Sequence, residues 1–120
     1  FLLKSPEFSD RHKEFMDTLL AYIEENIGDS ELRVDDMASQ LRMSRTVFYE
    51  RIKEIADMAP ADFLRHVRMQ RAEELIKGTR EPFSQISYQV GFTDPKYFSK
   101  CFKKHTGMSP SEYRKASQNE

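Results

Sequence analysis

The sequence predicts an all-α fold of about seven helices, in which two helix-turn-helix subdomains are joined by a long linker helix. Three observations support this prediction. Apolar residues recur at helical spacing, no alternating apolar and polar pattern of useful length is found, and one pattern of helix, turn and helix occurs twice. The length of 120 residues suits one domain or two very small ones, and 38% of hydrophobic residues suits a modest core.

The first helix is expected over residues 10–27. Ser9 or Asp10 can cap its start, and Gly28 can end it. Its apolar residues share one face at the spacing of an α-helix, and this face is expected to be buried. The residues of this face are Phe15, Leu19, Tyr22, Ile23 and Ile27.

A pattern of apolar positions over residues 34–63 is repeated over residues 83–113. In each copy, three apolar residues spaced i, i+3, i+7 precede a turn, and a second helix follows the turn. Val34, Met37 and Leu41 correspond to Phe83, Ile86 and Val90 at a shift of 49, and after one inserted residue Phe48, Ile52, Met58, Pro60 and Phe63 correspond to Phe98, Phe102, Met108, Pro110 and Tyr113 at a shift of 50. So many matches indicate a structural duplication.

The first copy carries the signals of a short helix and a second, capped helix. Asp35 and Asp36 fall in the first turn of the short helix, where the helix dipole favours acidic groups. Ser44 is expected to cap the second helix.

The second copy carries equivalent signals. Gly91 can adopt the left-handed conformation that ends its short helix. Thr93 or Asp94 can cap the next helix, and Pro95 is tolerated in the first turn of that helix.

A long helix is expected between the copies, from Pro60 to residue 77, with Gly78 just past its end. Its apolar residues are Phe63, Leu64, Val67, Leu75 and Ile76. The predicted division of the chain is an N-terminal linker or tail (1–9), the first helix-turn-helix subdomain (10–58), the linker helix (59–78), the second helix-turn-helix subdomain (79–116) and a C-terminal tail (117–120).

Charge is distributed unevenly along the chain. The net charge is -1, but residues 1–32 carry three basic and eight acidic groups, whereas residues 83–116 carry six basic and two acidic groups. A polyanion responds to the local field and not to the total charge. The second copy is therefore a candidate surface for nucleic acid.

The second helix of each copy separates inward apolar residues from outward polar residues. In the first copy, Phe48, Ile52 and Ile55 are expected to face inward, and the outer face carries Thr46, Tyr49, Glu50 and Lys53, with Arg45 at the N-terminal end. In the second copy, Phe98, Cys101, Phe102 and His105 are expected to face inward, and the outer face carries Lys96, Lys100 and Lys103, flanked by Tyr97 and Lys104. Outward arginine, threonine, tyrosine and glutamate side chains can read the edges of bases in a major groove.

Catalytic and metal chemistry is not expected. Cys101 has no base placed beside it and is expected to be a small core residue. His12, His66 and His105 are far apart in the sequence and do not form metal-ligand spacing with the cysteine. With no glycine-rich phosphate loop and no triad signature, we expect no enzyme, no catalytic or metal-binding residue and no cofactor.

The second copy resembles the signature half of the AraC/XylS-type transcriptional regulators. The resemblance is carried by "ISYQVGF", the four residues "TDPK", and "YFSKCFKKHTGMSPSEYR". It covers residues 14–115 and implies two helix-turn-helix subdomains whose recognition helices, about 44–56 and 94–105, enter the major groove. The stretch "SPEFSDRHKEFMDTLLAYIEENIGDSELRVDDMA" further resembles the C-terminal effector domains of hybrid two-component sensor regulators.

The resemblance implies a set of DNA-binding residues. In the first recognition helix these residues are Ser44, Arg45, Thr46, Tyr49, Glu50 and Lys53, and in the second they are Pro95, Lys96, Tyr97, Lys100, Lys103 and Lys104, the last two nearer to phosphates. Two departures from the family pattern are Asp57, where many relatives have glycine, and Glu50, where relatives often have a basic residue.

The length of the linker helix is compatible with reading one duplex. Its 18 residues span about 27 Å, near the ~34 Å between successive major-groove faces on one side of B-DNA. The expected function is sequence-specific binding of double-stranded DNA in transcriptional regulation, through two successive major grooves. The alternative is a helical protein-interaction module in which the lysine-rich face meets an acidic partner.

The expected context is a larger cytoplasmic regulator, or the cytoplasmic face of the membrane if the protein is a membrane-bound hybrid sensor. The chain begins with Phe1 and contains no evident small-molecule pocket or phosphoacceptor. We therefore expect an N-terminal sensor or receiver region outside these residues, homodimerisation through that region, and contact with the transcription machinery as possible partner interactions.

Overall fold

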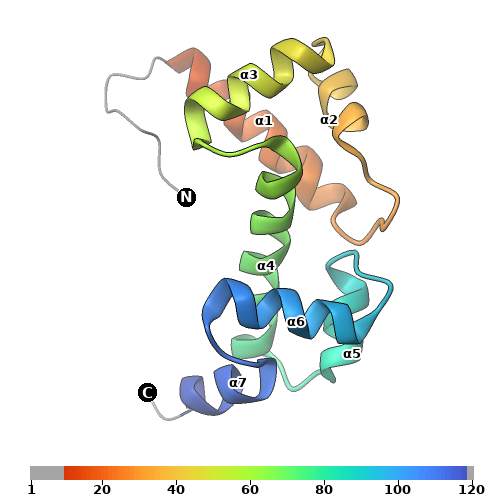
Figure 1. Ribbon diagram of the computed structural model, residues 1–120, viewed down its shortest axis with the longest axis vertical. Helices are drawn as coiled ribbons and strands as arrows, with labels where there is room; N and C mark the ends of the chain where they lie inside the picture. Colours follow the sequence, from red (N-terminus) through yellow and green to blue (C-terminus); the bar gives the residue numbers. More distant parts are fainter. Residues whose placement is uncertain (1–9, 119–120) are drawn as a thin grey trace. The chain divides into compact units, whose positions relative to one another are not determined.

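The computed structural model describes residues 10–118, and all regular structure in that range is α-helical (Figure 1). This confirms the all-α prediction of about seven helices. The helices are α1 (Asp10–Asn26), α2 (Val34–Gln40), α3 (Arg45–Ala56), α4 (Pro60–Gly78), α5 (Phe83–Gln89), α6 (Pro95–Thr106) and α7 (Pro110–Gln118). The tail predicted over residues 1–9, and with it the Ser9 cap, lies outside the described residues, as do residues 119–120.

The chain divides into two compact units. The described part of the first unit consists of residues 10–26 and 32–65, which include α1, α2, α3 and the start of α4. The described part of the second consists of residues 27–31 and 66–118, which include the rest of α4 and α5, α6 and α7. The boundary falls inside α4, and residues 27–31, which follow α1, belong to the second unit.

The first unit buries the apolar faces that the sequence predicts for α1 and α3. Phe15, Leu19 and Ile23 are buried on α1, although Tyr22 is only half-buried and Ile27 lies beyond the end of the helix. On α3 the buried residues are Phe48, Ile52 and Ile55, and the ring of Phe48 lies 6.2 Å from the ring of Phe15. Helical periodicity therefore located these two buried faces correctly.

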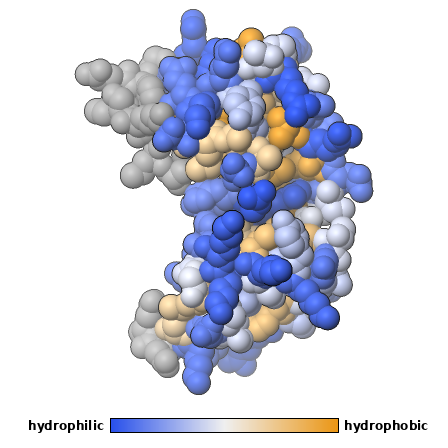
Figure 2. Space-filling model, in the orientation of Figure 1, coloured by the Kyte–Doolittle hydropathy of each residue, from blue (hydrophilic) through white to orange (hydrophobic). Residues whose placement is uncertain are grey.

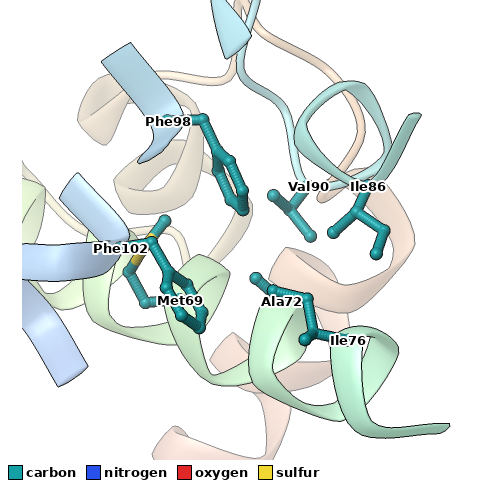
Figure 3. Packing of buried hydrophobic residues seen from close by; sticks show 7 residues of the cluster. All are labelled: Met69, Ala72, Ile76, Ile86, Val90, Phe98 and Phe102. Carbon is teal, nitrogen blue, oxygen red and sulfur yellow. The ribbon is translucent and has the colours of Figure 1, made fainter. Parts of the chain in front are cut away.

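The second unit has a hydrophobic core formed by α4, α5, α6 and the start of the turn between α5 and α6 (Figure 3). Partly buried residues, including Cys101 and Tyr113, pack against it. The thiol of Cys101 is free and lies at the edge of this core, as the inward placement of Cys101 predicted. The core residues are Met69, Ala72, Ile76, Ile86, Val90, Phe98 and Phe102.

The duplication extends to the backbone of the turns. Arg42, after α2, and Gly91, after α5, both have positive φ angles, of 57° and 88°. Asp57, after α3, and Gly107, after α6, also have positive φ angles, of 57° and 84°. The members of each pair are separated by the shifts that relate the two sequence copies, so the left-handed conformation predicted for Gly91 is confirmed and has a counterpart in the first unit.

The end of α4 differs slightly from the prediction. Gly78 was expected just past the helix, but it is the last helical residue. The amide of Thr79 donates a hydrogen bond to the carbonyl of Leu75 at 3.1 Å, and the Thr79 hydroxyl donates to the same oxygen at 2.6 Å. These bonds continue the helical pattern by one residue.

Candidate nucleic-acid interface

Helix α3 presents a polar outer surface from a well-anchored inner face. The Ser44 hydroxyl oxygen caps the helix and accepts a hydrogen bond from the amide of Val47 at 3.2 Å. Three buried apolar residues hold the opposite side in the first unit. All six site residues expected on this helix are exposed, and they are Ser44, Arg45, Thr46, Tyr49, Glu50 and Lys53.

The structure adds one residue and one partner to this surface. The side chain of Val47 is 43% exposed, close to the 47% of Tyr49. Position 47 lies outside the buried stripe of α3, so the helical spacing of the sequence could have indicated that Val47 is exposed. A guanidinium nitrogen of Arg45 lies 3.4 Å from a carboxylate oxygen of Asp35, which the sequence had suggested only as a favourable charge at the start of a helix.

Helix α6 has the same construction with different residues. The Asp94 carboxylate caps it by accepting from the amide of Lys96 at 3.0 Å, and Pro95 occupies the first helical position. Phe98 and Phe102 are fully buried and fix the inner face. Pro95 is half-buried, and the other five site residues expected here are exposed; these are Lys96, Tyr97, Lys100, Lys103 and Lys104.

The two outer surfaces differ in charge. Helix α3 contains three basic and two acidic residues, whereas α6 contains four lysines and no acidic residue. Within residues 10–118, none of the four lysines of α6 is in an ion pair, whereas Arg45 of α3 lies beside Asp35. Hydrophilic residues dominate the face drawn in Figure 2, including the region where Figure 1 places α6. The basic surface predicted for the second copy is therefore available to a polyanion.

A cluster of polar side chains supports the C-terminal end of α6. A ring nitrogen of His105 lies 3.2 Å from one carboxylate oxygen of Glu73, and the other oxygen accepts a hydrogen bond from the Tyr113 hydroxyl at 2.8 Å. The imidazole of His66 meets that of His105 edge-on, with ring centroids 5.2 Å apart. Burial, followed by the positive charge of His105, lowers the pKa of His66, and burial together with Glu73 raises the pKa of Tyr113.

Two arginines of the second unit have structural partners. Arg114 donates from Nε to the carbonyl of Ile76 at 3.0 Å, and its guanidinium lies 4.5 Å from the centroid of the Phe83 ring. Arg68 donates to the carbonyl of Asp29 at 2.8 Å. We therefore include the lysines of α6 in the candidate interface of this unit and leave out Arg68 and Arg114.

The described residues offer no group of three or more histidine, cysteine or acidic side chains arranged to hold a metal ion. In the same part of the chain, every helix is too short or too polar to cross a membrane.

Three comparisons identify relatives of this chain. Histidine kinase P4 of Formosa agariphila is 39% identical over 92 residues, which is 77% of this chain and 7% of that protein. The Msm operon regulatory protein of Streptococcus mutans is 34% identical over 113 residues, which is 94% of this chain and 40% of that protein. The chain thus spans less than half the length of these two relatives.

Similarity in structure agrees with similarity in sequence. The C-terminal domain of AraT, a response regulator from Geobacillus stearothermophilus, has a TM-score of 0.77 and 30% identity, covering 85% of this chain and 84% of that chain. A family model described as a helix-turn-helix domain matches residues 37–116. The chain therefore belongs to the AraC/XylS-type helix-turn-helix family of DNA-binding transcriptional regulators.

Proposed function

We propose that this chain binds a specific double-stranded DNA sequence in transcriptional regulation, with α3 and α6 each entering a major groove. The observation that supports this most directly is the pair of capped helices, each with a buried aromatic inner face and an exposed polar outer face. A helix presented in this way can enter a major groove with its N-terminal residues against the base edges. Membership of the family supports the same proposal.

In α3, the base-reading residues proposed are Arg45, Thr46, Tyr49 and Glu50. Arginine can donate two hydrogen bonds to guanine, and glutamate can accept from the amino group of cytosine. The exposed Val47 adds an apolar group suited to a thymine methyl. Ser44 and Lys53, near the two ends of the helix, are proposed to contact the DNA backbone.

In α6, the proposed base-reading residues lie in the first two turns, and the later lysines contact phosphates. Tyr97 is 53% exposed and can contact base edges or sugars beside the lysines. The residues proposed to read bases are Pro95, Lys96, Tyr97 and Lys100, and those proposed to contact phosphates are Lys103 and Lys104.

A selection experiment tests the proposal. The chain is incubated with a randomised pool of 30-base-pair duplexes at near-physiological salt, and the bound duplexes are sequenced. We expect a motif of two blocks about one helical turn apart, since each reader contacts one major-groove face. Arg45→Ala should relax one block and Lys100→Ala the other, because each removes one set of contacts.

A matched control and a contrary result complete this test. Lys115→Ala removes an exposed lysine of α7 outside the proposed readers, and it should leave both blocks unchanged. If no sequence is enriched, specific reading of DNA by this chain is contradicted. Saturable, salt-sensitive binding to an acidic protein surface would then favour the alternative, a helical protein-interaction module.

We also propose that the chain acts as the non-enzymatic output region of a larger regulator located in the cytoplasm. Two findings support this context: the alignment with 7% of a histidine kinase and 40% of an operon regulatory protein, and the structural similarity to the C-terminal domain of a response regulator. A sensor or receiver region of the same protein would then supply the signal and the homodimer contacts. Size-exclusion chromatography of the chain alone should show a monomer, and a stable dimer would contradict this assignment of the dimer contacts.

A further inference from the structure

An ion pair joins the two helices of the first helix-turn-helix. Nη1 of Arg45, the first residue of α3, lies 3.4 Å from a carboxylate oxygen of Asp35, which is in the first turn of α2. Both helices belong to the first unit and are in contact with each other. The pair therefore places an acidic group beside a residue that is proposed to read a base.

The backbone around the pair is held by hydrogen bonds within the first unit. The carboxylate of Asp36 accepts from the amide of Arg33 at 3.0 Å at the start of α2. Across the turn between α2 and α3, the amide of Met43 donates to the carbonyl of Ala38 at 3.0 Å. The helix-turn-helix backbone thus sets the separation of the two paired residues, and only their side chains are left to move.

The pair is exposed to solvent. The side chain of Arg45 is 72% exposed and that of Asp35 is 56% exposed. An exposed pair contributes little to stability, because water screens both charges. The larger consequence arises on binding, where a duplex that excludes water strengthens the interactions between neighbouring charges.

The pair occupies one end of the guanidinium of Arg45. Asp35 contacts Nη1, and the guanidinium carries further N–H donors on Nε and Nη2, which form its other edge. Two parallel donors of this kind match the O6 and N7 acceptors of guanine. Guanine is neutral whereas a phosphate carries a negative charge, so the carboxylate of Asp35 disfavours a phosphate contact by Arg45 more than a guanine contact.

The equivalent positions of the second helix-turn-helix carry no such pair. At the shifts that relate the two copies, Asp35 corresponds to Ser84 and Arg45 corresponds to Pro95. Helix α6 also contains no acidic residue. The acidic partner therefore distinguishes the first reader from the second.

We propose that Asp35 is a positioning residue that sets the base specificity of Arg45. It orients the guanidinium at the start of α3 and lowers its attraction for phosphates, so that Arg45 contacts a guanine instead. This inference rests on the proposed function, in which α3 reads bases.

A measurement without DNA tests whether Asp35 holds Arg45. The order parameter of the Arg45 Nε–H bond is obtained from nitrogen-15 relaxation in the wild type and in Asp35→Asn, which removes the charge with little change in size. We expect a lower order parameter in Asp35→Asn. The control Asp62→Asn should keep the wild-type value at Arg45, since Asp62 pairs instead with Arg65 at 3.2 Å. An unchanged order parameter in Asp35→Asn would overturn the positioning role.

Binding to DNA tests the specificity. A ratio of two affinities is measured, one for the duplex of the selected sequence and one for a duplex in which the base pair read by Arg45 is replaced; Arg45→Ala identifies that base pair in the selection. Asp35→Asn should lower this ratio about fivefold, the upper end expected from an exposed ion pair. Asp35→Glu keeps the charge and should restore the ratio to within about twofold, and the control Asp62→Asn should keep the wild-type ratio.

The position of the loss shows whether Asp35 acts through Arg45. In Asp35→Asn, discrimination should fall at the base pair read by Arg45 and stay at the wild-type level in the block read by α6. An equal fall at every base pair of the first block would mean that Asp35 acts on the whole unit or on the duplex directly, and the positioning role would be wrong.

The outcomes separate this inference from the proposed function. If the wild type enriches no sequence, the proposed function fails and the specificity role fails with it, while the order parameter still decides whether Asp35 holds Arg45. If the wild type is specific but Asp35→Asn keeps the wild-type ratio, only the role of Asp35 is wrong.

Discussion

The two helix-turn-helix units bend the chain at the same two points but use different residues there. The first unit has Arg42 and Asp57 in the left-handed conformation, where the second unit has Gly91 and Gly107. The left-handed conformation costs a non-glycine residue roughly 1–2 kcal/mol, and the first unit contains two residues that bear this cost. Of the two glycines, Gly91 has neighbouring atoms in the space that a Cβ would fill, whereas Gly107 has none within 4 Å of that position. The comparison teaches that backbone conformation alone does not require glycine in this turn, whereas the approach of residues 27–31 does.

The largest expected effect is on stability, and it distinguishes Gly91 from Arg42, the corresponding residue of the first unit. Gly91→Ala should lower the free energy of unfolding by about 3 kcal/mol, because the strain of a left-handed alanine adds to a clash with the carbonyl of Ile27 and with Arg68. The corresponding change in the first unit, Arg42→Gly, should shift it by less than about 1 kcal/mol. Urea unfolding followed by circular dichroism measures both. Similar losses for the two variants would contradict the distinction between the turns.

The two recognition helices also differ in electrostatics, and this predicts unequal contributions to binding. Lys100→Ala should weaken binding to the selected duplex about tenfold, as expected when one base-reading contact is lost. Glu50→Ala should change the affinity less than about threefold, since removing its repulsion of phosphates offsets any lost base contact. Titrations of the selected duplex with each variant measure both affinities. Equal losses, or a larger loss for Glu50→Ala, would contradict this order.

The fold of the two units could be predicted because burial leaves a periodic signal. The inner stripe of α6, with Phe98 and Phe102, follows from helical spacing, and the matching stripe of α3 reveals the duplication. Capping by Ser44 and Asp94 is equally local, since each side chain accepts from an amide two or three residues later. Local interactions of this kind can be predicted from a single sequence.

The attachment of residues 27–31 could not be predicted from the sequence. The bond from Arg68 to Asp29 joins residues 39 positions apart, and contacts at that separation impose no period on the sequence. Gly28 was interpreted only as the end of a helix, yet it also lies against the carbonyl of Gln89. For the candidate site, exposure of the outer residues followed from the inner stripe, but the pairing of Arg45 with Asp35 depends on how α2 meets α3.

A smaller effect is expected at the second left-handed position, where the comparison can be sharpened within one unit. Gly107→Ala should lower the free energy of unfolding by about 1 kcal/mol, because the conformation is strained for alanine but no atom lies within 4 Å of the added Cβ. This is less than the loss expected for Gly91→Ala, which differs by its clash. Urea unfolding under the same conditions provides the comparison. A loss as large as that of Gly91→Ala would show that strain alone accounts for both.

The smallest effect concerns pH, and it distinguishes the second unit through the contact between His66 and His105. Burial and the charge of His105 lower the pKa of His66 below its ordinary value of 6.5, so the unfolded chain binds more protons than the folded chain just below that pH. Stability from this group is complete above pH 6.5 and falls as the pH drops through the folded pKa. His66→Gln should therefore flatten the loss of stability between pH 7.5 and pH 5.5, measured by urea unfolding. An unchanged slope in His66→Gln would mean that other groups cause the pH dependence.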